Sequence, residues 1–459
     1  MPPISRLFIA NRGEIALRVI RACRDLGIES VLGASEADTS SLPARMADRV
    51  VCIGPARATD SYLKVETIVC AALGTRCQGV HPGYGFLAER PELAEACERN
   101  GLVFVGPSAR CIELMGNKLT ARTTAHSCGI PVIPGSARLE DLDGALRAAA
   151  EAGYPVMLKA AAGGGGRGMK AVWNEHELRS AFPMATAESA AAFGDGTLYL
   201  EHFVPNARHV EVQIAGDRQG KVIQLGERDC SVQRRYQKVI EEAPAYGVPM
   251  ATRRALQQAA VALGNAIRYE NVGTVEFIYD PAHDRYFFLE MNTRIQVEHP
   301  VTEMVTGVDL VKAQLAIAAD LPLSIGKAEP AITGHAIECR ITAEAPYDGF
   351  RPCPGRITRW EPPEGPHLRL DSHCYEGYTV PPYYESLIAK LIAWGGDRAE
   401  ALVRMRNALG AFSVSGIETT IPFLIDILGH PSYVAGDVST EWLEASLAEK
   451  LLELPGREL

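Results

Sequence analysis

The sequence lacks any pair of cysteines at Cys-x-x-Cys spacing and any cluster of histidine and cysteine at the spacing of zinc ligands. Its eleven cysteines are an odd number, and they are scattered from Cys23 to Cys374. This pattern argues against a structural zinc site. We therefore expect reduced thiols, most of them buried.

Long apolar runs are also missing. No stretch approaches the roughly 18 to 20 uninterrupted apolar residues of a membrane span. Near the start, the apolar run in MPPISRLFIANRGEIALRV is too short for a signal peptide before Asn11, Arg12 and Glu14 interrupt it. We therefore expect a cytoplasmic enzyme or binding protein with no membrane partner.

An excess of positive charge is absent as well. The chain has 46 Lys and Arg against 56 Asp and Glu, which gives a formal net charge of -10. A general nucleic-acid binder would show a basic domain or stripe. We expect no nucleic-acid partner, and an anionic ligand would have to be held by local cations.

What is present is a chain of 459 residues, long enough for two to four domains. Residues 1–115 alternate short apolar strands such as RLFIA with helical patterns, which predicts a parallel sheet wrapped by helices. Residues 116–327 hold the Gly-rich and charge-dense motifs. Residues 328–459 mix strands such as HAIECRITAE with a helical DRAEALVRMRNALGAF. The expected fold class is α/β, with α+β character in a multi-domain chain.

A glycine-rich loop interrupts the middle block. YPVMLKAAAGGGGRGMKAVW places five glycines within residues 163–168, between Lys159 and Lys170. Glycine lets backbone N–H groups point at a phosphate. A Walker A loop would need Gly-Lys-Ser/Thr, and a dinucleotide loop should open a helix, whereas MKAVW is typical of a returning strand. The interpretation is a mobile hairpin flap over a nucleotide, with a plain hairpin tip as the alternative.

Two further segments carry charge without a decisive pattern. TLYLEHF predicts an apolar strand ending in Glu201, which is either a nucleotide hinge or an ordinary strand end. His209 and Glu211 alternate in phase on the next strand and could belong to a solvated face. GERDCSVQRRYQKVIEEAP nearly balances acids and bases, so a solvated charge run is its usual meaning, and a cationic wall against phosphates is the alternative.

A predicted hairpin brings two carboxylates together. GTVEFIYDPAHDRYFFLEMN forms two strands joined at DPAHD. If Tyr279 faces Arg285, then Glu276 and Glu290 are diagonal neighbours, roughly 7 to 8 Å apart at the backbone. Two such carboxylates beside a phosphate flap are a plausible site for Mg²⁺.

The segment LEMNTRIQVEHP, residues 289–300, has polar residues at every second position from Glu290 to Glu298. In a straight strand these side chains share one face, and eight residues at about 3.3 Å each separate Glu290 from Glu298 by about 26 Å. The row would then have a metal end and a second end, where Arg294 and Gln296 hold a small planar anion beside Glu298 as general base. A polar strand face in water is the alternative.

Seven motifs in order, IANRGEIA, HPGYGFL, GGGGRGM, RHVEVQ, ERDCS, GHAIECRI and GYTVPPYY, together with EMNTRIQVEHPVTE, resemble the biotin carboxylase subunit of acyl-CoA carboxylases. The likeness spans nearly the whole chain. It implies an ATP-grasp fold with an N-terminal Rossmann-like domain, residues 1–115, an ATP-grasp domain, 116–327, with a mobile lid at about 132–203, and a C-terminal domain, 328–459. It also implies a homodimer.

The resemblance implies that ATP activates bicarbonate to carboxyphosphate, whose carboxyl group passes to biotin on a separate biotin carboxyl carrier protein. The nucleotide contacts would be Lys118, Lys159, Gly165, Gly166, Glu201, His209, Gln233 and Lys238, and the Mg²⁺ or Mn²⁺ ligands Glu276, Glu290 and Asn292. The bicarbonate and biotin site would be Arg294, Gln296, Val297, Glu298, Arg340 and Tyr84. Among these, Glu298, Arg294, Arg340 and Lys238 would be catalytic.

Four positions depart from the family pattern: Ala162, His202, Tyr236 and Glu385. They put turnover rate and nucleotide affinity in question rather than reaction type. No biotin-attachment motif is present, since the only Met-Lys pair, Met169 and Lys170, lies in the flap. We therefore expect the carrier and the carboxyltransferase to be separate polypeptides. Another ATP-grasp ligase that makes an acyl phosphate, and a weakly active nucleotide-binding paralogue, are the alternatives.

Overall fold

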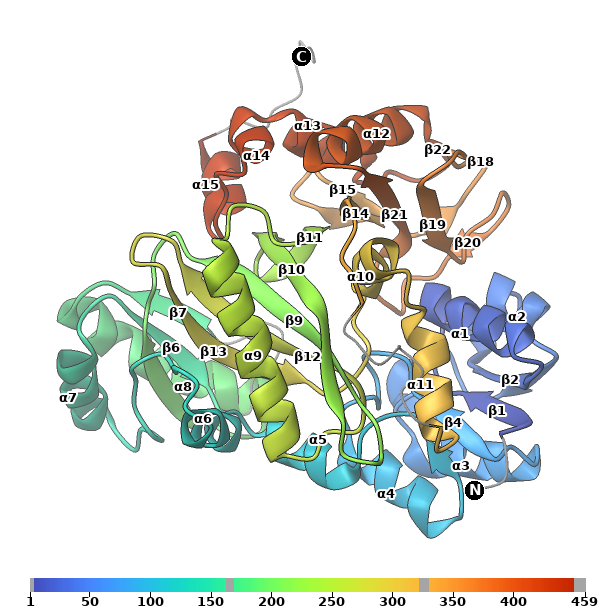
Figure 1. The fold of residues 1–459 in the computed structure, drawn as a ribbon, viewed down its shortest axis with the longest axis horizontal. Helices are drawn as coiled ribbons and strands as arrows, with labels where there is room; N and C mark the ends of the chain where they lie inside the picture. Colours follow the sequence, from blue (N-terminus) through green and yellow to red (C-terminus); the bar gives the residue numbers. More distant parts are fainter. Residues whose placement is uncertain (1–3, 162–168, 322–329, 450–459) are drawn as a thin grey trace.

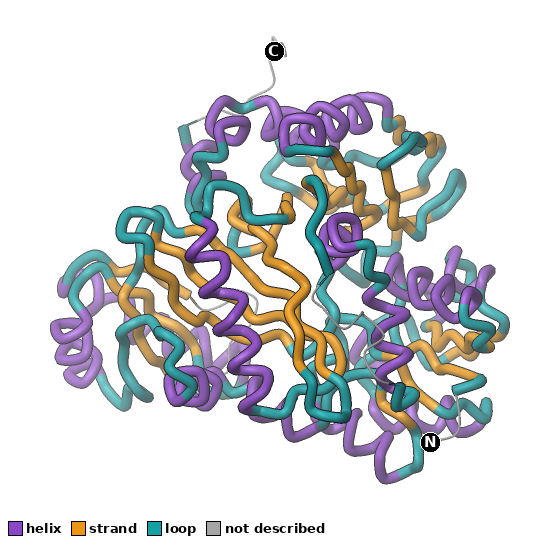
Figure 2. The backbone as a smooth tube through the Cα atoms, in the orientation of Figure 1, coloured by secondary structure: helices purple, strands orange, loops and turns teal. Residues whose placement is uncertain are grey.

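A computed structural model describes residues 4–161, 169–321 and 330–449. The N-terminal part is a five-stranded parallel sheet in the order β3-β2-β1-β4-β5, as the alternating pattern predicts. Its strands are β1 (Arg6–Ile9), β2 (Glu29–Ala34), β3 (Arg49–Cys52), β4 (Gly79–His81) and β5 (Val103–Phe104). Its helices are α1 (Gly13–Asp25), α2 (Leu42–Met46), α3 (Val65–Gly74), α4 (Pro91–Arg99) and α5 (Ala109–Gly116), which surround the sheet in Figure 2.

A three-stranded antiparallel sheet, β7-β6-β8, forms a lobe at the opposite side of the molecule (Figure 1). It consists of β6 (Val156–Ala160), β7 (Met169–Val172) and β8 (Leu198–His202), and it packs with α7 (Leu142–Ala152) and α8 (Glu175–Phe193). The predicted strands on both sides of the glycine loop are confirmed. The loop itself, including Ala162, Gly165 and Gly166, lies outside the described residues.

The lobe is preceded by α6 (Lys118–Ser127). Asn117 is its N-cap, and the Asn117 side chain accepts a hydrogen bond of 3.1 Å from the backbone N–H of Thr120. Asparagine is favoured at this position because it satisfies an otherwise free backbone donor. The cap places Lys118 at the first residue of the helix.

The central element is an eight-stranded antiparallel sheet in the order β13-β12-β9-β10-β11-β14-β21-β19. The strands are β9 (Arg208–Gly216), β10 (Val222–Arg234), β11 (Gln237–Ala243), β12 (Asn271–Asp280), β13 (Arg285–Asn292), β14 (His335–Thr342), β19 (Leu368–Ser372) and β21 (Leu387–Gly395). Strands before and after the predicted boundary at 327/328 therefore share one sheet. The domain boundaries stay a prediction.

Helix α9 (Met250–Ala266) crosses one face of this sheet (Figure 1). Its Leu256 and Leu263 pack in one core with Val210 and Val212 of β9 and Phe277 of β12. Because side chains alternate along a strand, the intervening residues of β9 and β12 face the other side of the sheet. That second face is polar and holds the candidate site.

The chain continues through α10 (His299–Thr306) and α11 (Leu310–Ala318) to the C-terminal part. There α12 (Arg398–Ala411) and α13 (Ile421–Gly429) pack against β14 and β21, and α14 (Pro431–Ala435) and α15 (Trp442–Ala448) follow. The short strands are β15 (Glu344–Ala345), β16 (Arg351–Pro352), β17 (Gly355–Arg356), β18 (Arg359–Glu361), β20 (Thr379–Val380) and β22 (Ser413–Ser415).

The hairpin of β12 and β13 corrects the predicted register. Tyr279 faces Tyr286, and a bulge between Glu276 and Phe277 in the pairing shifts the ladder, so that Glu276 lies directly opposite Glu290. The two carboxylates are a cross-strand pair and not diagonal neighbours. A bulge adds one residue to one strand, which a count from the turn cannot anticipate.

The polar row at 289–300 is not one strand. β13 ends at Asn292, and residues 293–298 turn before α10 begins at His299. The backbone N–H of Thr293 donates to the Glu89 side chain at 3.2 Å and not to a neighbouring strand. The prediction that Glu298 lies about 26 Å along a straight strand from Glu290 is therefore wrong.

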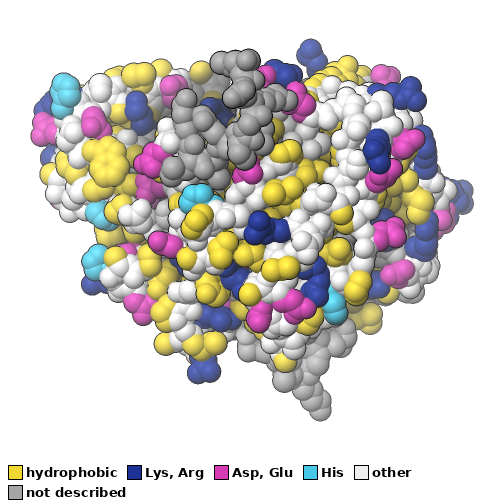
Figure 3. All heavy atoms as spheres, turned by 90° about the horizontal axis from the view of Figure 1, so that it is seen from above, with side chains coloured by type: hydrophobic (Ala, Val, Ile, Leu, Met, Phe, Trp, Pro, Cys, Tyr) yellow, Lys and Arg dark blue, Asp and Glu magenta, His cyan; other side chains and the backbone are white. Residues whose placement is uncertain are grey.

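The expectation about thiols agrees with the structure. All eleven cysteines are free, with Cys52 and Cys70 exposed, Cys128 half-buried and the rest buried. Within the described ranges no helix combines the length and apolarity needed to traverse a bilayer. On the face drawn in Figure 3, side chains of both charges are interspersed with hydrophobic ones, so this face offers no broad basic patch.

Candidate active site

One ammonium group organises the polar face of the sheet. Lys238, on β11, donates to three carboxylates, at 2.6 Å to Glu211, 2.9 Å to Glu276 and 2.6 Å to Glu298. Burial lowers the pKa of Lys238, but the three acids raise it by more, so the group stays charged. Two of these acids bind a second cation as well, Glu211 with Arg228 and Glu298 with Arg340, so carboxylates and cations alternate in one buried cluster.

This arrangement brings the two predicted ends of the row together. Glu276, from the expected metal end, and Glu298, from the expected acid-base end, contact the same Lys238 nitrogen. The turn after Asn292 folds residues 293–298 back toward β11. The predicted metal and base positions therefore lie in one cluster.

The metal end has oxygen donors that fit a hard cation. Glu276 and Glu290 face each other across β12 and β13, and Lys118 lies 3.6 Å from Glu290. The Asn292 amide donates to Glu276 at 2.8 Å, so it positions this carboxylate. Burial raises the pKa of Glu276, but Lys238 and His209 together outweigh this effect and hold the pKa well below its usual range. Two carboxylates facing each other suit Mg²⁺ with phosphate oxygens.

Glu298 lies between two cations. Its second oxygen accepts a hydrogen bond of 2.9 Å from Arg340 of β14, which also binds Glu241 at 2.5 Å. Glu298 is 2% exposed. Burial alone raises the pKa of Glu298, but Lys238, Arg340 and Arg228 lower it below the usual range. The group is therefore a carboxylate at neutral pH and can accept a proton.

The predicted anion site is formed by the turn before α10. Arg294 donates from Nε to Glu89 at 2.9 Å and from Nη2 to Asn292 at 3.1 Å. Gln296 donates to Glu276 at 2.8 Å. The Val297 carbonyl accepts a hydrogen bond of 2.8 Å from Lys390. The guanidinium is thus fixed at the edge of the Lys238 cluster, where a planar anion would meet it.

The lobe contributes a second group of charges. Lys159 of β6 forms an ion pair with Glu201 of β8, and Arg122 of α6 binds the same carboxylate at 2.6 Å. Glu201 is buried, so it is not a solvated strand end. Burial raises the pKa of Glu201, but the cations Lys159 and Arg122 together outweigh this effect, so the pKa lies below its usual value.

The charge run in β10 and β11 is buried except near its turn, where Arg234 is half-buried and Arg235 is exposed. Arg228 has no exposed surface, and it binds Glu211 at 2.5 Å and Gln296 at 2.9 Å. His209 lies 3.1 Å from Glu276, and the Gln233 amide lies 2.9 Å from the ring of His209. The solvated interpretation is therefore wrong for His209, for Glu211 and for the buried part of this run, and it holds for Arg235 in the turn.

Tyr84 and three of the four unusual positions lie within the described residues. Tyr84, half-buried, donates from its hydroxyl to Glu14. His202 contacts the backbone carbonyl of Gly153 at 3.0 Å. Tyr236 occupies the exposed turn between β10 and β11. Glu385 is exposed. The pKa of Tyr84 is raised mainly by burial and by Glu14, and the charge of Glu385 raises it by a smaller amount.

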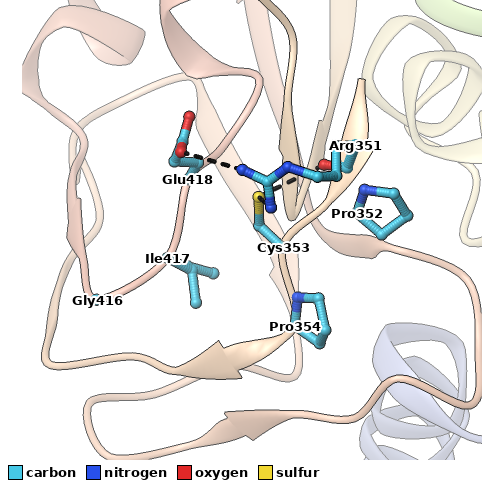
Figure 4. A pocket seen from close by; sticks show the side chains of 7 residues that line it. All are labelled: Arg351, Pro352, Cys353, Pro354, Gly416, Ile417 and Glu418. Carbon is cyan, nitrogen blue, oxygen red and sulfur yellow. Dashed lines mark hydrogen bonds and ion pairs between the residues drawn. The ribbon is translucent and has the colours of Figure 1, made fainter. Parts of the chain in front are cut away.

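Sequence reasoning missed Arg122, Glu89, Glu241, Lys390 and Glu14. Each comes from a segment far along the chain from its partner, and no local pattern marks it. A surface hollow in the C-terminal part, lined by Arg351 to Pro354 and by Gly416 to Glu418 (Figure 4), contains none of the predicted site residues. Glu276, Glu298 and Lys238 lie on the polar face of the sheet and not in that hollow.

The antiparallel nucleotide lobe, the polar sheet face and the carboxylate hairpin define an ATP-grasp ligase. Residues 117–325 match the family model "Carbamoyl-phosphate synthase L chain, ATP binding domain". Residues 3–112 match "Biotin carboxylase, N-terminal domain", and residues 338–445 match "Biotin carboxylase C-terminal domain". The chain belongs to the biotin carboxylase family.

Individual relatives agree. The chain is 50% identical over 442 residues to biotin carboxylase 1 of Bacillus subtilis, which covers 96% of this chain and 98% of that protein. A biotin carboxylase complex with β-γ-ATP from Campylobacter jejuni superposes with a TM-score of 0.94 at 44% identity, covering 96% of this chain and 99% of that one. The biotin carboxylase domain dimer of Hydrogenobacter thermophilus 2-oxoglutarate carboxylase, solved with MgADP, ADP and bicarbonate, gives 0.95 at 44% identity, with coverage of 99% and 100%.

Proposed function

We propose that the chain uses ATP and bicarbonate to carboxylate biotin carried by a partner protein. The observation that carries the proposal is the junction at Lys238, which joins Glu276 of the metal pair to Glu298. Arg340 binds the other oxygen of Glu298. A phosphate-binding end and a base thus share one site, as a reaction between a nucleotide and a small acid requires.

The nucleotide end positions phosphates. Lys118, Lys159 and Lys238 supply positive charge, and Glu201, His209 and Gln233 supply polar contacts around it. When bound to Glu276 and Glu290, with Asn292 as support, a magnesium or manganese ion would offset charge on the phosphate oxygens. Gly165 and Gly166 belong to the proposed lid, about 132–203, which would exclude water from an unstable mixed anhydride.

The anion end would bind bicarbonate through Arg294, Gln296 and the backbone of Val297. Glu298 takes the proton of bicarbonate on its carboxylate while a bicarbonate oxygen attacks the γ-phosphorus of ATP. The bond from that phosphorus to the β-phosphate oxygen breaks, and ADP leaves. The product is carboxyphosphate, held beside Lys238.

Carboxyphosphate then releases CO₂ and phosphate next to the biotin pocket. The ureido nitrogen of biotin attacks CO₂, and its proton passes to the released phosphate. Arg340 stabilises the negative charge that develops on the ureido oxygen, and Tyr84 lines the pocket. The substrate is biotin on a biotin carboxyl carrier protein.

The wider assignment follows the same proposal. We place the domains at 1–115, 116–327 and 328–459, and we propose a cytoplasmic homodimer that works with separate carboxyltransferase subunits. The dimer is supported by the dimeric relative from Hydrogenobacter thermophilus. The role would be the first half-reaction of acetyl-CoA or another acyl-CoA carboxylase, with fatty acid biosynthesis as one destination.

The test is ADP release from the purified chain, with bicarbonate and free biotin added separately and together. We expect hydrolysis to depend on both. Hydrolysis indifferent to bicarbonate would refute the proposal and favour another ATP-grasp ligase. Tight ATP binding without turnover would favour a nucleotide-binding scaffold.

A further inference from the structure

A second buried lysine lies beside the proposed anion site. Lys390, on β21, has no exposed surface. Its ammonium group donates to the Val297 carbonyl at 2.8 Å and lies 3.1 Å from Glu14. A fully buried charge is costly unless its partners compensate for lost water, so a lysine here calls for a specific reason.

The contact to Val297 fixes the peptide that leads into the proposed base. The Val297 carbonyl and the Glu298 N–H belong to one planar peptide group. Residues 293–298 lie outside any strand, so no β-ladder holds them in place. The hydrogen bond from Lys390 therefore takes over a role that a neighbouring strand would otherwise have.

The partner of Lys390 reaches the other substrate. Glu14, at the second residue of α1, accepts hydrogen bonds from Lys390 and from the Tyr84 hydroxyl on the same oxygen. Tyr84 is the proposed wall of the biotin pocket. One carboxylate oxygen thus joins that wall to the lysine that holds the proposed bicarbonate turn, across three separate parts of the chain.

The charges around Lys390 keep it positive. Its charged neighbours are Glu14, Asp371 at 3.9 Å, Glu338, Arg369 and its cross-strand neighbour Arg340. Burial lowers the pKa of Lys390, but the acids Glu14, Glu338 and Asp371 raise it by more. The ammonium therefore remains a donor throughout the neutral pH range.

We propose that Lys390 and Glu14 form a positioning pair, which sets the Val297–Glu298 peptide and the Tyr84 wall relative to each other. The inference rests on the proposed function, because it assigns bicarbonate to the Val297 turn and biotin to Tyr84. It adds that both sites depend on one buried ion pair that touches neither substrate.

The experiment compares Lys390→Met with Arg398→Met in the full chain. Methionine keeps the length of the side chain but has no charge and no N–H donor. Arg398 also pairs with a buried acid, Glu242, at 2.7 and 2.9 Å, and it contacts backbone carbonyls of α14 and the rings of Tyr246 and Tyr433. Both variants therefore break a buried ion pair, and only one of them touches the bicarbonate turn.

For Lys390→Met, we expect kcat/KM for bicarbonate to fall about tenfold or more, equivalent to about 1.4 kcal/mol. The KM for ATP should stay within twofold. For Arg398→Met, we expect a lower melting temperature with both KM values unchanged. An unchanged KM and kcat/KM for bicarbonate in Lys390→Met, after correction for folded fraction, would overturn the inference.

A second variant keeps the test decisive if Lys390→Met fails to fold. Glu14→Gln retains an oxygen acceptor for both neighbours but removes the charge. It should raise the KM for bicarbonate and the KM for free biotin together, and a normal value for both would refute the coupling. If the wild-type chain shows no dependence on bicarbonate, the proposed function fails first, which is a separate outcome.

Discussion

The assignment of Glu298 as the base can be tested by Glu298→Gln. The amide keeps the size of the side chain but cannot take a proton from bicarbonate. General acid-base catalysis contributes about 10²- to 10⁴-fold, which corresponds to roughly 2.7 to 5.4 kcal/mol of barrier at about 1.36 kcal/mol per tenfold. We expect the rate of bicarbonate-dependent ATP hydrolysis to decrease by a factor within this range of about 10²- to 10⁴-fold, while nucleotide affinity barely changes.

The structure also sets the side effects of this change. Glu298 accepts from Lys238 at 2.6 Å and from Arg340 at 2.9 Å, whereas an amide oxygen accepts and its nitrogen donates. One of the two charged hydrogen bonds is therefore lost, at a cost of about 1.5 to 3 kcal/mol in stability. The melting temperature of each variant must accompany its kinetics.

Glu211→Gln is the matched control. Glu211 is fully buried and lies 2.6 Å from the same Lys238 nitrogen, and it reaches the bicarbonate turn through two cations, Lys238, which binds Glu298, and Arg228, which binds Gln296. If only the charge around Lys238 matters, both variants will lose activity equally. We expect the fold decrease in kcat/KM caused by Glu211→Gln to be less than a tenth of the fold decrease caused by Glu298→Gln. Equal losses, or normal turnover in Glu298→Gln, would refute the base assignment.

Three further predictions follow from the same contacts. Glu290→Gln should raise the magnesium concentration needed for half-maximal hydrolysis without changing the KM for bicarbonate, and an unchanged magnesium requirement would remove Glu290 from the metal site. Lys238→Met leaves three buried carboxylates without their shared cation, so urea denaturation should show a loss of about 3 to 5 kcal/mol in unfolding free energy; wild-type stability would contradict this. Burial lowers the pKa of His81 to about 4 from about 6.5 in an unfolded chain. The unfolded chain therefore binds more protons between these values, so stability is complete above pH 6.5 and declines toward pH 4, by on the order of 3 kcal/mol. Urea denaturation at pH 7.5 and pH 5 measures the decline, His81→Gln should reduce it, and equal stability of the wild type at both values would contradict the sign.

The sequence was sufficient where contacts are local. The turn DPAHD predicted the hairpin of β12 and β13, and the Asp280 side chain accepts from the Ala282 N–H at 3.1 Å within that turn. The pattern of short apolar runs predicted the parallel N-terminal sheet. Each of these features depends on residues a few positions apart.

The arrangement of the site could not be read in the same way. Arg294 binds Glu89, 205 positions away, and Lys390 binds Val297, 93 positions away. The alternation from Glu290 to Glu298 is typical of a strand, but no strand among the described residues pairs with residues 293–298. A polar period of two predicts a strand only where a partner completes the ladder.

The interpretation of the charge run in β10 and β11 as solvated is wrong for its buried residues for a related reason. Arg228 and Glu211 are acceptable in the interior because they bind each other at 2.5 Å, and their partners lie on other strands. Composition alone makes such residues look solvated. Only the sheet order, which places β9, β10 and β11 side by side, explains their burial.

The most direct test of the central claim follows carbon from bicarbonate to biotin. Purified chain is incubated with ¹⁴C-bicarbonate, free biotin, magnesium and ATP, and acid-labile label in biotin is measured together with ADP. We predict labelled biotin only when ATP is present, and loss of the label in Glu298→Gln. ADP formation without any label in biotin would contradict the account.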